Sequence, residues 1–203
     1  MARGLVARAA AERHRPQERR AGLRLLCDAD HYTELVTREL ATASVSVWIA
    51  TANLKELYVE APVGSRERAR GRFTSVLDVF GALADRGVEL RILHGRPPSG
   101  PFASALAVRS RLRSRLELRE CPRLHFKAVV IDGRLLYLGS ANFTGAGLGA
   151  RGSGKRNFEI GLLTDDDYLL DSVQARFDAV WTGKECGSCR LRAKCPGPLD
   201  TSR

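Results

Sequence analysis

The chain has 203 residues, of which 44% are hydrophobic and 28% are charged, and this balance excludes a wholly disordered protein. The 33 basic residues outnumber the 23 acidic ones, so the formal net charge of +10 favours a polyanionic partner, either nucleic acid or an anionic membrane surface. No apolar run approaches the roughly 20 residues that a transmembrane helix needs, and no secretory signal is evident, so we expect a cytoplasmic protein.

The first half of the chain is expected to alternate strands with helices, after a basic arm or helix over residues 1–21. The expected elements are an edge strand at 22–26, a helix at about 30–42, a buried strand at 44–50, a helix at about 71–86 and a strand at 88–93. Asp28 or Asp30 can cap the first helix, and Gly87 is suited to end the second. A loop at 52–70 connects the buried strand to the second helix.

The second half continues this alternation and adds an antiparallel pair. The expected elements are a helix at 102–113, a strand at 115–119, two strands at 124–131 and 135–138, a strand at 158–163 and a helix at 165–182. Asp132 and Gly133 predict the turn of a hairpin between the two central strands. The pattern predicts one α/β domain at 22–183, in which a mixed β-sheet has helices on both faces, followed by a Cys-rich tail at 184–203.

Chemically active side chains gather around this predicted hairpin. His125 and Lys127 are two residues apart on the first strand, so they point to the same face. The hairpin brings Ser140 and Asn142, at the end of the second strand, back beside them. Glu159 starts the next strand and can reach the same end of the sheet. We therefore expect these five side chains to converge.

Such a cluster is suited to phosphoryl chemistry. A neutral imidazole is a nucleophile near neutral pH, and a carboxylate behind it can fix its tautomer and stabilise the positive charge that develops. Lys127, Ser140 and Asn142 supply hydrogen-bond donors and one positive charge, which suit a phosphoryl group. No carboxylate pair suited to Mg²⁺ accompanies the cluster, so we expect that catalysis needs no metal.

The spacing of these residues resembles a known signature. His-x-Lys-x₄-Asp followed by Gly-Ser-x-Asn resembles the HKD motif of the phospholipase D superfamily, and the segment 157–159 is similar to the downstream Asn-x-Glu of that family. The resemblance implies a phospholipase D-like fold over about 23–182. We assign Asp132 a structural role in the turn rather than a chemical one. The candidate catalytic set that the resemblance implies is His125, Lys127, Asn142, Ser140, Glu159 and Asp132.

The resemblance also implies a mechanism and an assembly. Members of the superfamily form a phosphohistidine on one His, while a second His protonates the leaving group and then activates water. Larger members carry two motifs in one chain, whereas this chain carries one. The resemblance therefore implies a homodimer that shares one active site, in which Glu159 orients His125.

The charge of the chain bears on the substrate. A chain of this size with one motif resembles the small Nuc-type and Zucchini-type nucleases. The net charge and the basic stretch 109–127 favour the backbone of DNA or RNA over a single lipid headgroup. Aromatic residues make up only 6% of the chain, so we expect little sequence preference. The candidate nucleic-acid-binding residues are Arg109, Arg113, Arg123, Lys155 and Arg156.

Two other functions stay open at this point. One is a phospholipid-cleaving phospholipase D, and the other is a non-catalytic nucleic-acid-binding subunit of a larger assembly. A small phospholipase D-like domain with a Cys-rich end also resembles the phospholipase D-like component of DISARM-type anti-phage defence systems. That resemblance implies a role in antiviral defence, with other defence-system proteins as partners.

The Cys-rich tail is the second notable feature. Cys186, Cys189 and Cys195 are closely spaced, and such a set can bind Zn²⁺ or a [4Fe–4S] cluster if a fourth ligand is present. The spacing resembles the iron–sulfur staple of RecB-family nucleases, in which the cluster joins the C-terminal tail to the N-terminal part. The fourth ligand is Cys27 or Cys121, and we favour Cys27 because it would join tail to head in the same way.

Overall fold

The computed structural model describes residues 18–201 apart from 19, 61–63, 65 and 72. Most of the basic arm expected at 1–21 lies outside the described residues. None of the helices in the described part of the chain is long and apolar enough to cross a membrane.

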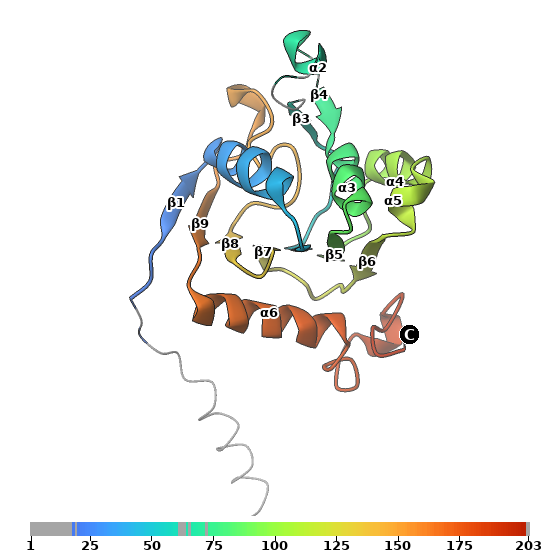
Figure 1. Ribbon diagram of the computed structural model, residues 1–203. Coiled ribbons are helices and arrows are strands. Elements are labelled where there is room, and N and C mark those ends of the chain that lie inside the picture. Colours follow the sequence, from blue (N-terminus) through green and yellow to red (C-terminus); the bar gives the residue numbers. More distant parts are fainter. Residues whose placement is uncertain (1–17, 19, 61–63, 65, 72, 202–203) are drawn as a thin grey trace, which may run out of the picture.

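A seven-stranded mixed sheet forms the centre of the molecule (Figure 1). Its strands, in chain order, are β1 (Arg24–Cys27), β2 (Ser46–Thr51), β5 (Glu89–His94), β6 (Leu116–Glu120), β7 (Lys127–Ile131), β8 (Leu135–Gly139) and β9 (Ile160–Thr164). Their order across the sheet is β1-β9-β8-β7-β2-β5-β6. The pairs β2–β5 and β5–β6 are parallel and all other pairs are antiparallel. The α/β class and the mixed sheet predicted from the sequence are thus confirmed.

Helices cover both faces of the sheet (Figure 1). The helices of one face are the π-helix η1 (His31–Glu39), the 3₁₀ turn η2 (Leu40–Thr42), α3 (Val76–Asp85), α4 (Gly100–Ala107) and α5 (Ser110–Arg113). Helix α6 (Asp167–Trp181) crosses the other face alone among the described helices. The remaining elements are the small hairpin β3 (Tyr58–Glu60) and β4 (Phe73–Ser75), the helix α2 (Arg66–Ala69), and the 3₁₀ turns η3 (Ser153–Lys155) and η4 (Arg192–Lys194).

Aromatic stacking anchors α6 to the sheet. The ring of Phe177 stacks on Trp48 of β2 and on Trp181, with centroid separations of 5.3 and 5.6 Å. The guanidinium groups of Arg91 and Arg119 lie 5.4 and 4.6 Å from the ring centroid of Trp181, within cation–π range. Burying these rings fixes the position of the helix, and the chain beyond residue 181 therefore emerges beside β6.

Several element boundaries differ from the sequence-based expectation. The helix expected at 102–113 is two helices, because Arg109 leaves the helical conformation with φ −105° and ψ 68°. The expected helix at 71–86 begins at Val76, where the Ser75 hydroxyl caps it by accepting from the Leu77 N–H. The expected loop at 52–70 contains the strand β3 and the short helix α2. The strand expected at 124–131 begins at Lys127, so His125 precedes it.

The register places seven strand ends at one end of the sheet. The C-terminal ends of β1, β2, β5, β6 and β8 meet the N-terminal ends of β7 and β9 there. We call this the site end. Segments far apart in sequence leave the sheet at this end, and their side chains can form a shared site.

Candidate active site at the site end of the sheet

His125 and Asn142 line the same pocket, which has a volume of about 160 Å³. His125 lies two residues before β7, and Asn142 lies three residues after the end of β8. The pairing of Lys127 with Gly139 across β7 and β8 brings these two segments side by side. The predicted hairpin therefore brings His125 and Asn142 to one end of the sheet.

The pocket also has walls that the sequence reasoning did not identify. Asn53 follows β2 and Arg96 follows β5, and both line the pocket with His125. Gly95 allows this close approach, because a Cβ atom there would lie 2.5 Å from the carbonyl oxygen of Leu124. The sequence does contain a signal for these two residues, because residues just after the C-terminal ends of parallel strands commonly form binding sites in α/β sheets.

The amide of Asn142 is held in a defined orientation. Its Oδ1 accepts hydrogen bonds from the backbone N–H of Asn53 at 3.1 Å and from the hydroxyl of Thr51 at 3.3 Å. Thr51 is itself buried, and its hydroxyl accepts from the Phe143 N–H at 2.9 Å. Because the oxygen of the amide is anchored, its nitrogen points away from Asn53 and Thr51. This nitrogen is a hydrogen-bond donor and is available to bind an anion.

Lys127 provides a positive charge beside His125. Its Nζ donates to the backbone carbonyl of His125 at 2.7 Å, and the side chain is half-buried. The imidazole of His125 is exposed. An ammonium group next to an accessible imidazole is suited to bind a phosphate oxygen while the ring approaches phosphorus.

Glu159 is buried near the same end but makes contacts that were not expected. Its carboxylate accepts hydrogen bonds from the Ser140 hydroxyl and, at 3.0 Å, from the Asn157 amide. The two backbone groups of Glu159 pair with Asp28, whose side chain accepts at 2.9 Å and whose N–H donates at 3.0 Å. These are the hydrogen bonds of the Glu159 side chain within one chain, and the expectation that Glu159 orients His125 stays a prediction.

The two glycines that face each other across β8 and β9 make room for a tyrosine. A Cβ atom at Gly139 would lie 2.3 Å from the Tyr137 hydroxyl, and one at Gly161 would lie 2.3 Å from Cε2 of the same ring. Burial of this ring raises the pKa of Tyr137 well above its usual range. His31 packs edge-on against it at 5.5 Å. The motif glycine therefore serves packing beneath the site, which sequence spacing alone does not show.

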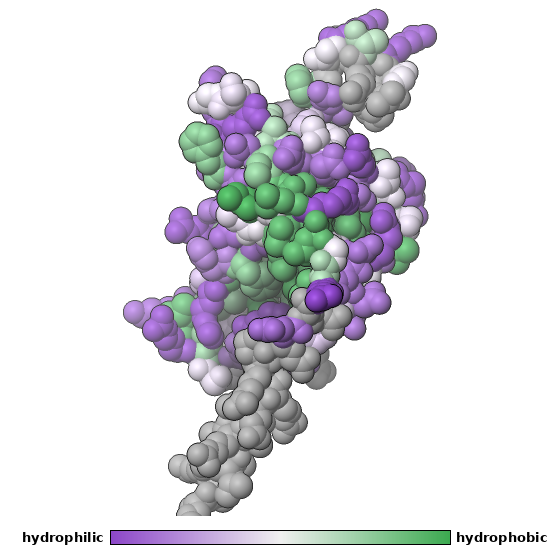
Figure 2. Space-filling model, turned by 90° about the vertical axis from the view of Figure 1, so that its left-hand side faces the viewer, coloured by the Kyte–Doolittle hydropathy of each residue, from purple (hydrophilic) through white to green (hydrophobic). Residues whose placement is uncertain are grey.

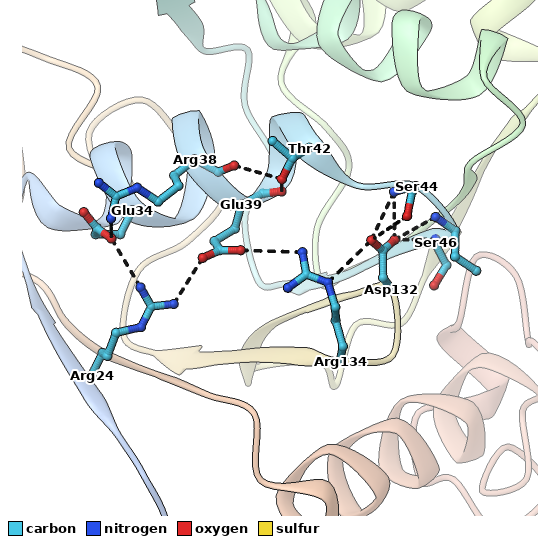
Figure 3. Close-up of polar contacts among 10 residues, drawn as sticks. Arg24, Glu34, Arg38, Glu39, Thr42, Ser44, Ser46, Asp132 and Arg134 are labelled. Carbon is cyan, nitrogen blue, oxygen red and sulfur yellow. Dashed lines mark hydrogen bonds and ion pairs between the residues drawn. The ribbon is translucent and has the colours of Figure 1, made fainter.

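Asp132, the remaining motif residue, lies at the opposite end of β7 (Figure 3). Its carboxylate accepts from the backbone N–H groups of Ser44, Val45 and Ser46 at 2.8–3.1 Å and from the Ser44 hydroxyl. Burial alone would raise the pKa of Asp132, but these hydrogen bonds outweigh it and hold the pKa below its usual range. The carboxylate joins the hairpin turn to the start of β2, and it is remote from the pocket.

The basic residues proposed to bind nucleic acid divide into two groups. Arg109 forms an ion pair with Asp78 at 2.8 Å, and Arg113 lies in α5, before β6 begins. Neither residue lines the pocket, and their assignment to nucleic acid binding stays a prediction. Arg123 lies two residues before His125, while Lys155 and Arg156 belong to the segment that leads into β9 at the site end.

The structure separates the two candidate fourth cysteines. Cys27 ends β1 and Cys121 follows β6, and these strands are the opposite edges of the sheet. Cys121 lines one pocket together with Cys186, Cys189 and Cys195. The preference for Cys27 is therefore wrong, because the whole width of the sheet separates it from the tail. All five thiols are free, and no group of three or more His, Cys, Asp or Glu residues within the described ranges is already arranged to hold a metal ion.

The thiols of this pocket differ in their surroundings. Burial raises the pKa of Cys121. A hydrogen bond from the backbone of Leu191 and a second from the Arg123 side chain lower the pKa of Cys189. Arg123 thus links the Cys-lined pocket to the segment that leads into His125.

Comparison with known proteins identifies the relatives of this fold. The family model described as cardiolipin synthase, PLD-like domain, matches residues 36–181. No curated protein matches the chain significantly. The structure of Nuc, a phospholipase D family member from Salmonella typhimurium, is similar with a TM-score of 0.55 and 18% identity, over 80% of this chain and 95% of that one.

Two further solved structures share the architecture. NucT from Helicobacter pylori aligns with a TM-score of 0.51 and 17% identity, over 78% of this chain and 94% of that one. A phosphatidylserine synthase from Haemophilus influenzae aligns with a TM-score of 0.54 and 12% identity, over 75% of this chain and 35% of that one. At these identities the similarities show the fold.

Proposed function

This chain belongs to the phospholipase D-like family, and from that membership we propose that it is a nuclease that cleaves phosphodiesters of DNA or RNA through a phosphohistidine at His125. The observation that carries the proposal is the pocket shared by His125 and Asn142, with Lys127 beside it. These side chains are a nucleophile, a neutral donor and a cation, which suit attack on a phosphodiester.

The arrangement accounts for both halves of such a reaction. An imidazole nitrogen of His125 attacks phosphorus, so that a P–N bond forms and the P–O bond to the leaving group breaks. Lys127 and the Asn142 amide stabilise the charge on the non-bridging oxygens. A second imidazole protonates the leaving oxygen, and the same ring then takes a proton from the water that releases the phosphoryl group. Each step balances without a divalent metal ion.

The second imidazole is proposed to come from another copy of the chain. An apolar patch lies beside Glu159 and supports this arrangement, because Leu25, Phe158 and Ile160 are 63%, 95% and 63% exposed. Figure 2 faces the β1 and β9 side of the molecule and shows apolar side chains gathered on its surface. An exposed apolar patch at the rim of a half-site is suited to a twofold interface.

The charge of the site favours a polyphosphate substrate. Arg96 lines the pocket, Arg123 and Lys127 flank His125, and the chain as a whole has a net charge of +10. Lys55 is also near, because its backbone N–H bonds to the carbonyl of Phe143, the residue after Asn142. Several cations around one phosphate site match a nucleic acid backbone better than a single headgroup.

The test is cleavage of labelled single- and double-stranded DNA and RNA in excess EDTA, with phospholipid vesicles as a separate substrate. We expect EDTA-resistant cleavage of at least one nucleic acid by the wild type and a loss of at least about 1,000-fold in His125→Ala. Arg111→Ala, an exposed cation of α5 away from the pocket, is the control and retains activity.

The other outcomes are equally informative. Hydrolysis of vesicles without nucleic acid cleavage would establish a phospholipid-cleaving enzyme in place of a nuclease. Tight nucleic acid binding without cleavage, unchanged in His125→Ala, would establish a binding subunit. Cleavage that EDTA abolishes would contradict the metal-independent mechanism.

A further inference from the structure

The C-terminal tail has almost no hydrophobic core of its own. Leu199 is the one fully buried side chain among residues 184–201, and η4 is the one regular element there. Ion pairs of Arg176 with Glu185 and of Arg192 with Asp200 are its clearest side-chain contacts. Exposed ion pairs contribute little stability, so a segment of this kind needs another means of holding its shape.

Successive backbone turns bring the three tail cysteines to the same pocket. The N–H of Cys186 bonds to the Gly183 carbonyl at 2.9 Å, and the N–H of Cys189 bonds to the Cys186 carbonyl at 3.2 Å. Two further turns of the same kind lead from Cys189 through Arg192 to Cys195. Three of these four turns end at a cysteine, and the three cysteines line one pocket.

The sheet supplies the fourth thiol from a fixed position. Cys121 follows β6, and its N–H bonds to the His94 carbonyl at 2.9 Å, which holds it at the site end. It lines the same pocket as the three tail cysteines, although at least 65 residues separate it from them in sequence. Two arginines also lie here, since Arg123 bonds to the Cys189 side chain and Arg192 is close to Cys186 and Cys195. Their charge suits a site that becomes anionic when thiols ionise.

We propose that Cys121, Cys186, Cys189 and Cys195 bind a thiophilic metal centre, either a Zn²⁺ ion or a [4Fe–4S] cluster. Four thiolates are a complete ligand set for both, and Cys-x₂-Cys is a common spacing within such sets. The thiols line the pocket without standing in ligating positions among the described residues, so binding turns their side chains inward and releases their protons.

The centre would join the tail to the segment that carries His125. Cys121 is four residues before His125, and the Leu124 N–H bonds to the Cys121 carbonyl at 2.8 Å. A metal bound at Cys121 therefore restrains the residues that position the imidazole. In this inference the cysteines are positioning residues, and the metal takes no part in the reaction at phosphorus.

The test is the metal content of the full chain purified without oxygen, measured by elemental analysis and native mass spectrometry. We expect about one zinc per chain, or about four iron with matching acid-labile sulfide and a visible absorption band that dithionite bleaches. Cys189→Ser is expected to lose at least half of the bound metal. Cys27→Ser is the matched control, because Cys27 lies at the opposite edge of the sheet, and it keeps the full content.

A second measurement protects the test against a variant that fails to fold. The metal is removed from the wild type with a chelator, and limited proteolysis then follows residues 184–201 while circular dichroism follows the sheet. We expect cleavage in this tail to rise at least about tenfold while the circular dichroism is kept. A wild-type chain without metal and with four free thiols, or with disulfides between them, would overturn the proposal, as would equal metal loss in both variants. Neither readout depends on nuclease activity.

Discussion

Asp132 shows how one carboxylate can organise a turn without taking part in chemistry. Its side chain is only 6% exposed and receives its hydrogen bonds from three consecutive backbone N–H groups at the start of β2. Its backbone has a positive φ of 55°, which the following Gly133 continues through the hairpin turn. The residue therefore fixes the register of β7 against β2 at the end remote from the pocket.

Replacing Asp132 by Asn should destabilise the protein by about 2–4 kcal/mol at pH 7, since the amide loses the charge and brings an NH₂ group toward N–H donors. Because the folded pKa of Asp132 is lowered, its contribution is present above about pH 4 and is lost as the pH falls through the folded pKa. Urea unfolding of both proteins at pH 7 and pH 3 measures this. The difference in unfolding free energy should shrink at pH 3, and a constant difference would contradict the assignment.

The residues at the site end differ in how firmly their side chains are held. Asn142 is oriented by the Asn53 backbone N–H and the Thr51 hydroxyl, whereas His125 is exposed and accessible to a substrate. Glu159 is tied to Ser140 and Asn157, so within one chain its role is to hold the segment between β8 and β9.

Among the elements of the fold, the β8–β9 pair is tightly packed around its two glycines. Gly139 and Gly161 face each other in this pair, and the ring of Tyr137 fills the space over both. Ser140 directly follows Gly139, Glu159 lies two residues before Gly161, and the two side chains bond to each other. Packing beneath the pair and hydrogen bonding at the site are therefore coupled.

The substitution Gly161→Ala tests this coupling. The added methyl would lie 2.3 Å from Cε2 of Tyr137 and 2.8 Å from Nε2 of His31, both in buried rings. We expect a loss of about 1–3 kcal/mol in unfolding free energy, as for other overpacked cores, together with reduced cleavage activity. Gly81→Ala in α3 is the control, because a Cβ there meets no atom within 4 Å. If thermal unfolding showed both variants to be equally stable, the β8–β9 pair would be able to accommodate the added methyl group.

At the scale of the whole molecule, the two edges of the sheet have different surroundings. The β6 edge lies beside the cysteine tail, and the β1 edge is flanked by the exposed apolar residues Leu25, Phe158 and Ile160 (Figures 1 and 2). An active site completed by a second copy of the chain needs only one edge of the sheet for that contact. The apolar edge is suited to that contact, and the tail lies at the other edge.

The substitution Phe158→Asp should break the proposed dimer, because it places a charge in the centre of an apolar contact. We expect the molar mass measured by light scattering to fall from that of two chains to that of one, with at least about tenfold loss of cleavage activity. Val108→Asp is the matched control, since Val108 is 81% exposed between α4 and α5, remote from the patch. A wild type that is already a single chain and fully active would contradict the shared site.

The class of the fold and the end of the sheet at which His125 and Asn142 share a pocket could both be predicted from the amino-acid sequence. Both depend on near neighbours in the chain, because strand periodicity and a hairpin turn bring residues together over short loops. Element boundaries depend on more distant contacts, as at Arg109, where the side chain pairs with Asp78 of another helix. Local propensity does not register such a contact.

Which distant segments share a site became visible in the three-dimensional arrangement of the strands. It placed Asn53 and Arg96 beside His125, gave Glu159 its partners, and put Cys121 rather than Cys27 next to the tail. These outcomes depend on the order of strands across the sheet, which crossover connections set, and on the path of α6 fixed by buried aromatic rings. The sequence distance between two strands says little about their order across the sheet, because connections of similar length can place the next strand toward either edge.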